Sequence, residues 1–201
     1  MNRVTLVVLA VLALAFAALT GLAVRNGILA SHDSGPGIGG PFQLVDQAGR
    51  PATEQILKGK WSAVFFGFTY CPEACPTTLF ALGQAEKQLN SKAFQTVFIS
   101  VDPERDTPRQ LALYLSNSAF PHATVGLTGR TEQIAAVAKE YAAFYVKAGT
   151  GQDYTVNHST QTYLMNPKGR FVCVIPYGAT PAVFAARIGA AMKQGANARS
   201  C

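Results

Sequence analysis

Residues 62–69, SAVFFGFT, form a nearly continuous apolar run, and this run constrains the fold more than any other feature of the chain. A strand with one solvated face alternates apolar and polar side chains, whereas an unbroken run indicates a strand covered on both faces. A helical pattern follows over residues 76–89, where Leu79, Leu82 and Leu89 mark one apolar face. We therefore expect a central strand in a sheet that is flanked by helices.

The domain around this strand is predicted to belong to the α/β class, because β-rich runs alternate with helical patterns from Pro41 onwards. Pro108 fits the first position of a helix, with Thr107 as its cap. A turn over residues 166–169, NPKG, makes the last two strands antiparallel, so the sheet is expected to be mixed. Strands are predicted over residues 42–44, 62–69, 95–101, 123–127, 160–165 and 171–175, and helices over 76–89, 108–118, 131–145 and 181–193.

A second apolar run, residues 4–24, contains no charged residue. At about 1.5 Å per residue, a helix of this length spans roughly 30 Å of hydrocarbon. The run exceeds the ~7–15-residue core of a signal peptide, so we prefer a membrane anchor over residues 1–25 to a cleaved signal peptide. Residues 26–40 are rich in Gly and Ser and predict a flexible tether. The folded domain is expected over residues 41–193, followed by a mobile tail at 194–201.

Composition excludes several classes of protein. With 49% hydrophobic residues the chain is too apolar for a disordered polymer, and four cysteines in 201 residues are too few for a disulfide scaffold. The 17 basic and 11 acidic residues give a net charge of +6, but the basic residues are scattered singly. We therefore expect no nucleic-acid partner.

The reactive chemistry is concentrated where the central strand meets its helix, in the sequence Cys71-Pro-Glu-Ala-Cys75. Cys75 is expected at the N-cap of a helix that Pro76 opens, where the helix dipole favours ionised sulfur. A two-residue spacer is the thioredoxin-like redox arrangement. The three-residue spacer found here can close a disulfide or hold two thiolates on one metal ion, so metal and redox roles are both open. An inert pair is disfavoured, because such junctions are common functional sites.

A third ligand would distinguish these roles, and the chain contains three histidines. His32 in the tether and His122 in a polar loop are expected to be solvated. His158 ends a polar loop just before a strand that should lie beside the central one, so it can act as a ligand or as an ordinary loop histidine. Two thiolates and one imidazole suit Cu(I), and Cu(II) with an added weak ligand, better than zinc, which prefers four ligands.

Two other groups have simpler expected roles. The acidic residues Asp102, Glu104 and Asp106 are expected to cap a solvent-exposed loop and to interact with water, rather than to face a partner or copper. Cys173 alternates with apolar residues on a strand and is expected to be an inert buried thiol. Cys201 is the last residue and has no predicted role, although a Cys173–Cys201 disulfide stays open.

Four sequence blocks together resemble the Sco/SenC family of copper chaperones. The longest runs from the GKW at residues 59–61 to the VFFGFTYCPEACPTTL at residues 64–79. The other three are PFQL at residues 41–44 with Asp46 and Gly49, ISVDPERDTP at residues 99–108, and YTVNHS at residues 154–159. The similarity covers residues 41–193, and the four blocks are specific in combination.

The resemblance implies a thioredoxin-like domain, tethered to a membrane, that binds one copper ion through Cys71, Cys75 and His158. It also implies a role in metallating the dinuclear copper centre of cytochrome c oxidase subunit II, with other copper chaperones or thiol reductants as further partners. Asn157 stands where the family often has an acidic residue. We expect a bacterial inner-membrane protein with its domain in the periplasm, since no Arg-rich transit peptide precedes the apolar run.

A second function remains open, namely a thiol-disulfide reductase that keeps the oxidase cysteines reduced so that copper can enter. Only this alternative would make the protein an enzyme. His158 separates the two functions, because disulfide exchange requires only Cys71 and Cys75. A peroxidase is a distant third, since its chemistry requires neither a partner cysteine four residues away nor a nearby histidine ligand.

Overall fold

The computed structural model describes residues 2, 5, 9, 12–13, 37–151 and 153–201. The chain divides into two units, residues 1–36 and 37–201. Within the described residues there is no helix with both the length and the apolar character needed to cross a membrane. Most of the expected anchor and tether, together with His32, lies outside the described residues.

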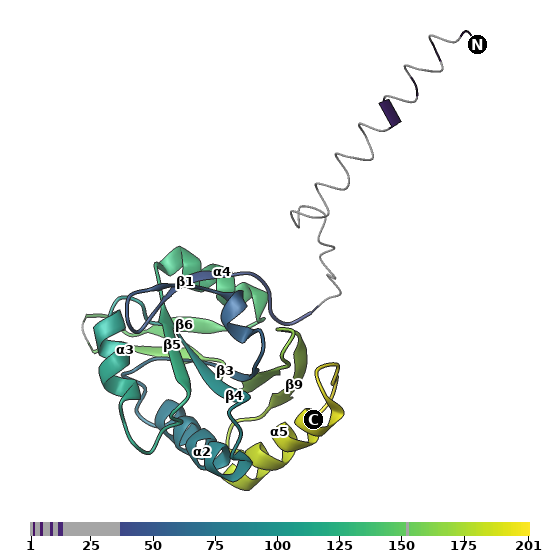
Figure 1. The fold of residues 1–201 in the computed structure, drawn as a ribbon. Coiled ribbons are helices and arrows are strands. Elements are labelled where there is room, and N and C mark those ends of the chain that lie inside the picture. Colours follow the sequence, from purple (N-terminus) through teal and green to yellow (C-terminus); the bar gives the residue numbers. More distant parts are fainter. Residues whose placement is uncertain (1, 3–4, 6–8, 10–11, 14–36, 152) are drawn as a thin grey trace. The chain divides into compact units, whose positions relative to one another are not determined.

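The unit formed by residues 37–201 is built on a seven-stranded sheet with the order β2-β1-β5-β4-β3-β8-β9 (Figure 1). Strand β3 pairs in parallel with β4 and antiparallel with β8, and every residue of β3 is buried. The expected central strand and mixed sheet are thereby confirmed. The strands are β1 Gln43–Asp46, β2 Pro51–Thr53, β3 Trp61–Gly67, β4 Phe94–Ser100, β5 Thr124–Thr128, β8 Thr162–Met165 and β9 Phe171–Ile175.

Helices cover this sheet, and a large hydrophobic core fills the space between them. Helices α2 and α5 pack against each other (Figure 1), and Leu82, Phe184 and Ile188 belong to the buried cluster beneath them. Thr107 caps α3 by accepting a hydrogen bond from the Gln110 amide, as expected. The helices are η1 Glu54–Leu57, α2 Ala74–Leu89, α3 Pro108–Leu115, α4 Thr131–Glu140 and α5 Pro181–Gln194.

The largest departure from the predicted elements follows α4, which was expected to continue to residue 145. The helix ends at Glu140, and Ala142 adopts the left-handed region with φ of 48°. A separate two-stranded antiparallel sheet follows, formed by β6 Tyr145–Ala148 and β7 Thr155–His158. This hairpin was expected to be a polar loop, because its short strands carry few apolar residues and only tertiary contacts favour pairing.

The two cysteines outside the CPEAC segment form a disulfide, so the expectation that Cys173 is a free, inert thiol was wrong. Cys173 lies on β9, and Cys201 reaches it with a Cα–Cα distance of 6.0 Å, a normal separation for a disulfide. Ala198 is buried beside them. The tail at residues 194–201 therefore has a covalent attachment to the sheet that the sequence pattern did not predict.

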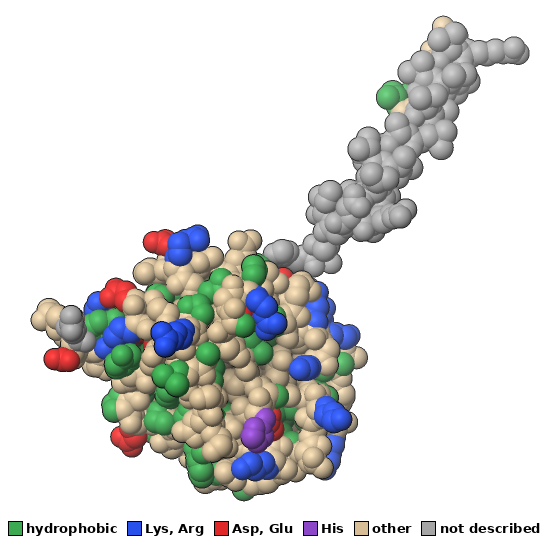
Figure 2. All heavy atoms as spheres, turned by 60° about the vertical axis from the view of Figure 1, so that its left-hand side comes forward, with side chains coloured by type: hydrophobic (Ala, Val, Ile, Leu, Met, Phe, Trp, Pro, Cys, Tyr) green, Lys and Arg blue, Asp and Glu red, His purple; other side chains and the backbone are tan. Residues whose placement is uncertain are grey.

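Basic side chains are dispersed over the face shown in Figure 2, where they lie among acidic and polar groups. This face therefore offers no concentrated positive charge of the kind that tracks a nucleic-acid backbone.

Gly67 at the end of β3 provides a test of this packing. A Cβ at this position would lie 2.7 Å from Cys75 Sγ and 2.8 Å from the Phe98 ring. We expect Gly67→Ala to lower the free energy of unfolding by roughly 1–3 kcal/mol, because the buried neighbours must move. Urea denaturation measures the loss.

Gly189→Ala is the matched control, because its Cβ would meet only a Leu89 methyl group at 3.7 Å within a helix. This substitution should leave stability unchanged or raise it by up to about 1 kcal/mol. Equal stability of the two variants would contradict the packing described for Gly67.

Candidate metal centre

Cys71 lies in the segment between β3 and α2, and Cys75 lies in the first turn of α2, beyond the carboxyl end of the central strand β3. The backbone turns after β3, where the Cys71 amide donates to the Phe68 carbonyl at 3.2 Å. Cys71 is 9% exposed and Cys75 is fully buried. Both sulfurs therefore belong to the hydrophobic core beyond the end of β3, and Cys71 keeps slight exposure.

The sequence pattern predicted Cys75 at the N-cap of the helix, but Cys75 does not occupy this position. Helix α2 begins at Ala74 with Glu73 as its N-cap, so Cys75 and Pro76 both lie in the first turn. Proline is tolerated there because the first N–H groups of a helix have no partner within the helix. The Cys71 sulfur instead accepts a hydrogen bond from the Cys75 amide at 3.3 Å.

His158, the last residue of β7, joins the two cysteines. Its Nε2 lies 3.6 Å from Cys75 Sγ and 4.0 Å from Cys71 Sγ. Two atoms bound to one metal at about 2.0–2.3 Å lie at most roughly 4.6 Å apart, so these separations fit a shared ion. Among the described His, Cys, Asp and Glu residues, these three form the group whose ligand atoms all lie within 4.8 Å of one another.

The orientation of the imidazole is fixed by its second nitrogen. Nδ1 lies 2.9 Å from the Ser159 carbonyl, which can only accept, so Nδ1 carries the proton. Nε2 is then the nitrogen available to a metal, and its lone pair faces the sulfurs when it ligates. The rings of Phe65 and Phe68 meet the imidazole edge-on, with centroids 6.3 and 5.6 Å away. The histidine is thus held from two sides.

The two thiols differ in acidity because their surroundings differ. Hydrogen bonds to the Cys71 sulfur stabilise its thiolate and lower the Cys71 pKa to about 4. The Cys75 thiol contributes most, and His158 and the amides of Cys75 and Glu73 contribute less, while burial opposes the shift. Burial raises the pKa of Cys75 well above its ordinary value, and the adjacent Cys71 sulfur adds to this effect. When no metal is bound, the pair therefore combines a slightly exposed thiolate, Cys71, with a fully buried protonated thiol, Cys75.

Asp106 was expected to cap and solvate a loop, and the expected solvation was wrong. The carboxylate is fully buried and accepts hydrogen bonds from the Thr69 amide at 3.0 Å, the Thr69 hydroxyl at 2.6 Å and the Ser100 hydroxyl at 2.7 Å. Burial raises its pKa. Asp106 thereby fixes the start of the cysteine segment, a role that sequence reasoning missed because the partners are distant in the chain.

Of the other two acidic residues, one is buried and one is exposed. Asp102 is also buried, contrary to expectation, and it pairs with Arg105, whereas Glu104 pairs with Lys147 at 2.8 Å on the surface. His122 is exposed, as expected.

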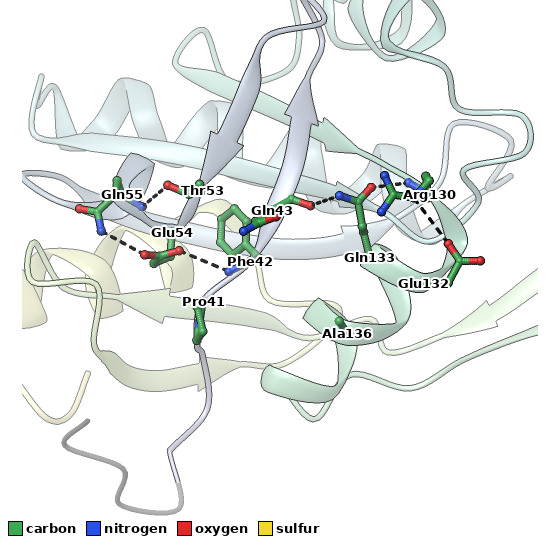
Figure 3. Close-up of a pocket in the computed structure, with 10 residues that line it drawn as sticks. All are labelled: Pro41, Phe42, Gln43, Thr53, Glu54, Gln55, Arg130, Glu132, Gln133 and Ala136. Atoms are coloured by element: carbon green, nitrogen blue, oxygen red, sulfur yellow. Dashed lines mark hydrogen bonds and ion pairs between the residues drawn. The ribbon is translucent and has the colours of Figure 1, made fainter. Parts of the chain in front are cut away.

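A pocket of about 600 Å³ lies elsewhere, between β1, η1 and the start of α4 (Figure 3). Its polar groups are paired with one another: Gln133 donates to the Gln43 carbonyl at 2.7 Å, and Glu54 accepts from the Phe42 amide at 3.3 Å. None of the three converging ligands lines it. The metal centre is therefore distinct from this pocket.

Soft ligands dominate the group formed by Cys71, Cys75 and His158. Two sulfurs and one imidazole nitrogen match the preference of Cu(I) for few, soft ligands, whereas a structural zinc site would need a fourth. The site that sequence reasoning left open between metal and redox chemistry is thus suited to copper.

Comparison with known proteins agrees with this geometry. The chain is 43% identical over 141 residues to the mitochondrial protein SCO2 of Saccharomyces cerevisiae, and 41% identical over 155 residues to the mitochondrial SCO1 homolog 1 of Arabidopsis thaliana. These alignments cover 67% and 75% of this chain but 46% and 45% of the relatives, so the chain spans about half the length of the curated relatives it matches.

Solved structures match the same region. The copper-bound structure of Arabidopsis thaliana ScoI has a TM-score of 0.74 at 38% identity, covering 78% of this chain and 99% of the other. Copper-bound yeast Sco1 gives a TM-score of 0.74 at 37% identity, covering 81% and 92% of the two chains. The expected thioredoxin-like α/β fold is thereby confirmed.

The family model described as SCO1/SenC matches residues 30–193, a range that includes all three converging ligands. Since this match covers well over half of the chain, the protein belongs to the SCO1/SenC family.

Proposed function

We propose that this protein is a copper chaperone that binds one copper ion through Cys71, Cys75 and His158. The observation that carries the proposal is the convergence of two sulfurs and a correctly oriented imidazole nitrogen within 4.8 Å. The copper-bound structures of related Sco proteins support it. Copper is the cargo of the protein, and the ion to be delivered is Cu(I) or Cu(II).

The target we propose is the dinuclear copper centre of cytochrome c oxidase subunit II. Cys71 retains a little exposure while Cys75 is buried, so a partner would approach the ion from the Cys71 side. A disulfide of a partner protein could take up two electrons from Cys71 and Cys75 by thiol-disulfide exchange, and the resulting Cys71–Cys75 disulfide would no longer offer its two thiolate ligands to the ion. Other copper chaperones or thiol reductants would supply the ion and keep the pair reduced.

A second function, thiol-disulfide reductase, is favoured by the acidity of the Cys71 thiol. A low-pKa thiolate near the surface is the usual attacking group in disulfide exchange. Buried Cys75 would then attack Cys71 in the mixed disulfide, reducing the partner and leaving a Cys71–Cys75 disulfide. This chemistry makes no use of the aligned imidazole of His158, so we place it second.

We further propose that residues 1–25 anchor the protein in a bacterial inner membrane, with residues 26–40 as a tether and the domain in the periplasm. The uncharged apolar run at residues 4–24 supports an anchor. The Cys173–Cys201 disulfide supports an oxidising compartment, where such bonds persist.

Copper titration tests the site. The protein with reduced Cys71 and Cys75 should bind about one copper ion per chain, and Cu(II) should produce absorption from sulfur-to-copper charge transfer. Protein in which these two cysteines are joined should bind almost none, because both thiolates are lost. Equal binding by the two forms would refute the ligand assignment.

His158→Ala distinguishes the chaperone from the reductase. If copper holding is essential, this variant should weaken copper binding more than about tenfold, or ~1.4 kcal/mol, and impair oxidase assembly nearly as much as Cys71→Ser. The measurement is oxidase activity at matched protein levels, with and without added copper salt. Near-normal activity of His158→Ala in copper-poor medium would favour the reductase.

A reporter fused after Cys201 tests the topology. An enzyme that is active only after export should be active in this fusion, because the domain is expected outside the cytoplasm. A reporter that works only in the cytoplasm provides the control. Activity of the cytoplasmic reporter alone would contradict the proposed location.

A further inference from the structure

Arg105, in the loop after β4, is a mostly buried cation next to the metal centre. Its side chain is 17% exposed, and its Nε donates to the Asp102 carboxylate at 2.5 Å. A second guanidinium nitrogen donates to the Tyr154 carbonyl at 2.9 Å. The head group is therefore fixed by directed bonds to two different segments of the chain.

Aromatic rings surround the same guanidinium. Its central carbon lies 3.7 Å from the centroid of the Tyr154 ring, 4.7 Å from that of Tyr70 and 5.9 Å from that of Phe68. These separations are within the range of cation–π attraction. The Tyr154 hydroxyl also donates to Asp102 at 2.5 Å, so the ring and the carboxylate hold one another in place.

Each of these rings contacts a proposed ligand or lies on a segment that carries one. Tyr70 immediately precedes Cys71 in the chain, and Phe68 packs edge-on against the His158 ring with centroids 5.6 Å apart. Tyr154 immediately precedes β7, the strand that ends at His158. Arg105 thus connects the segment carrying the cysteines with the hairpin carrying the histidine.

The hairpin depends on such connections. Strands β6 and β7 form a sheet separate from the seven-stranded sheet, and an isolated two-stranded hairpin is only marginally stable. On the side of the β4 loop it is held by Tyr154–Asp102, Lys147–Glu104 and the Arg105 contacts. The position of His158 relative to the sulfurs therefore depends in part on these side-chain contacts.

We propose that Arg105 is a positioning residue that acts on copper binding through His158, by holding the β6–β7 hairpin against the cysteine segment. The inference rests on the proposed copper function. Arg105 lies outside the ligand group, so its effect on affinity should require an imidazole at position 158. Without that imidazole, the location of the hairpin should no longer matter for the ion.

A double-mutant cycle on the full chain tests this dependence. Copper affinity is measured for the unmodified protein, Arg105→Met, His158→Ala and the double variant, all with reduced cysteines. Arg105→Met should weaken binding roughly tenfold in the unmodified background and change it less than about twofold in the His158→Ala background. The nitrogen hyperfine coupling in the electron paramagnetic resonance spectrum of the Cu(II) form should also weaken in Arg105→Met.

Arg130→Met is the matched control, because Arg130 is exposed and its guanidinium lies 3.8 Å from Glu132. It should leave both affinity and hyperfine coupling unchanged. Arg105→Lys keeps a positive charge beside Asp102 but lacks the planar fork, so it replaces Arg105→Met if that variant does not fold. It should show the same dependence on His158.

The outcomes separate this inference from the proposed function. Suppose that His158→Ala lowers the copper affinity. The positioning role is then refuted, while the ligand set stands, if the Arg105 variants bind copper normally. The same holds if the Arg105 variants lower the affinity equally with His158 present and with His158→Ala. If His158→Ala binds copper as tightly as the unmodified protein, the proposed ligand set itself fails.

Discussion

The pairing of buried strand β3 with β4 on one side and β8 on the other is the constraint on which the candidate centre depends. All seven residues of β3 are buried, so the strand has little freedom to shift within the sheet. Its end at Gly67 determines where the chain turns, and Cys75 Sγ lies so close that no side chain fits at Gly67. The sheet thus fixes the sulfurs as part of the hydrophobic core.

Burial then gives the two cysteines different roles. Cys71 is stabilised as a thiolate by the groups that donate to its sulfur, whereas Cys75 lies in an apolar environment that disfavours charge. The His158 nitrogen faces both sulfurs because its other nitrogen is bonded to the Ser159 carbonyl. This arrangement accounts for a site that can bind a soft ion when reduced and that retains the acidity needed for thiol exchange.

The support around the ligands is polar and comes from the loop after β4. Buried Asp106 holds Thr69 at the start of the cysteine segment, while Asp102 and Arg105 hold Tyr154 at the start of the histidine strand. One loop therefore contacts both halves of the centre. A buried carboxylate is stable only when hydrogen-bond donors surround it. Asp102 and Asp106 therefore require the donors that the cysteine segment and the histidine strand supply, although these are distant in the sequence.

The central strand, the mixed α/β sheet and the choice of Cys71 and Cys75 as candidate site residues could all be predicted from local patterns, because continuous apolar runs and proline-bounded helices are visible in the chain itself. For His158, the residues alone left two interpretations, and the family resemblance favoured a role as a ligand. Three features became visible only in the folded chain: the β6–β7 hairpin, the burial of Asp102 and Asp106, and the Cys173–Cys201 disulfide. Each of these features depends on contacts between residues far apart in the chain. The local sequence does not indicate which distant residue pairs with a short polar strand, a loop carboxylate or a single cysteine.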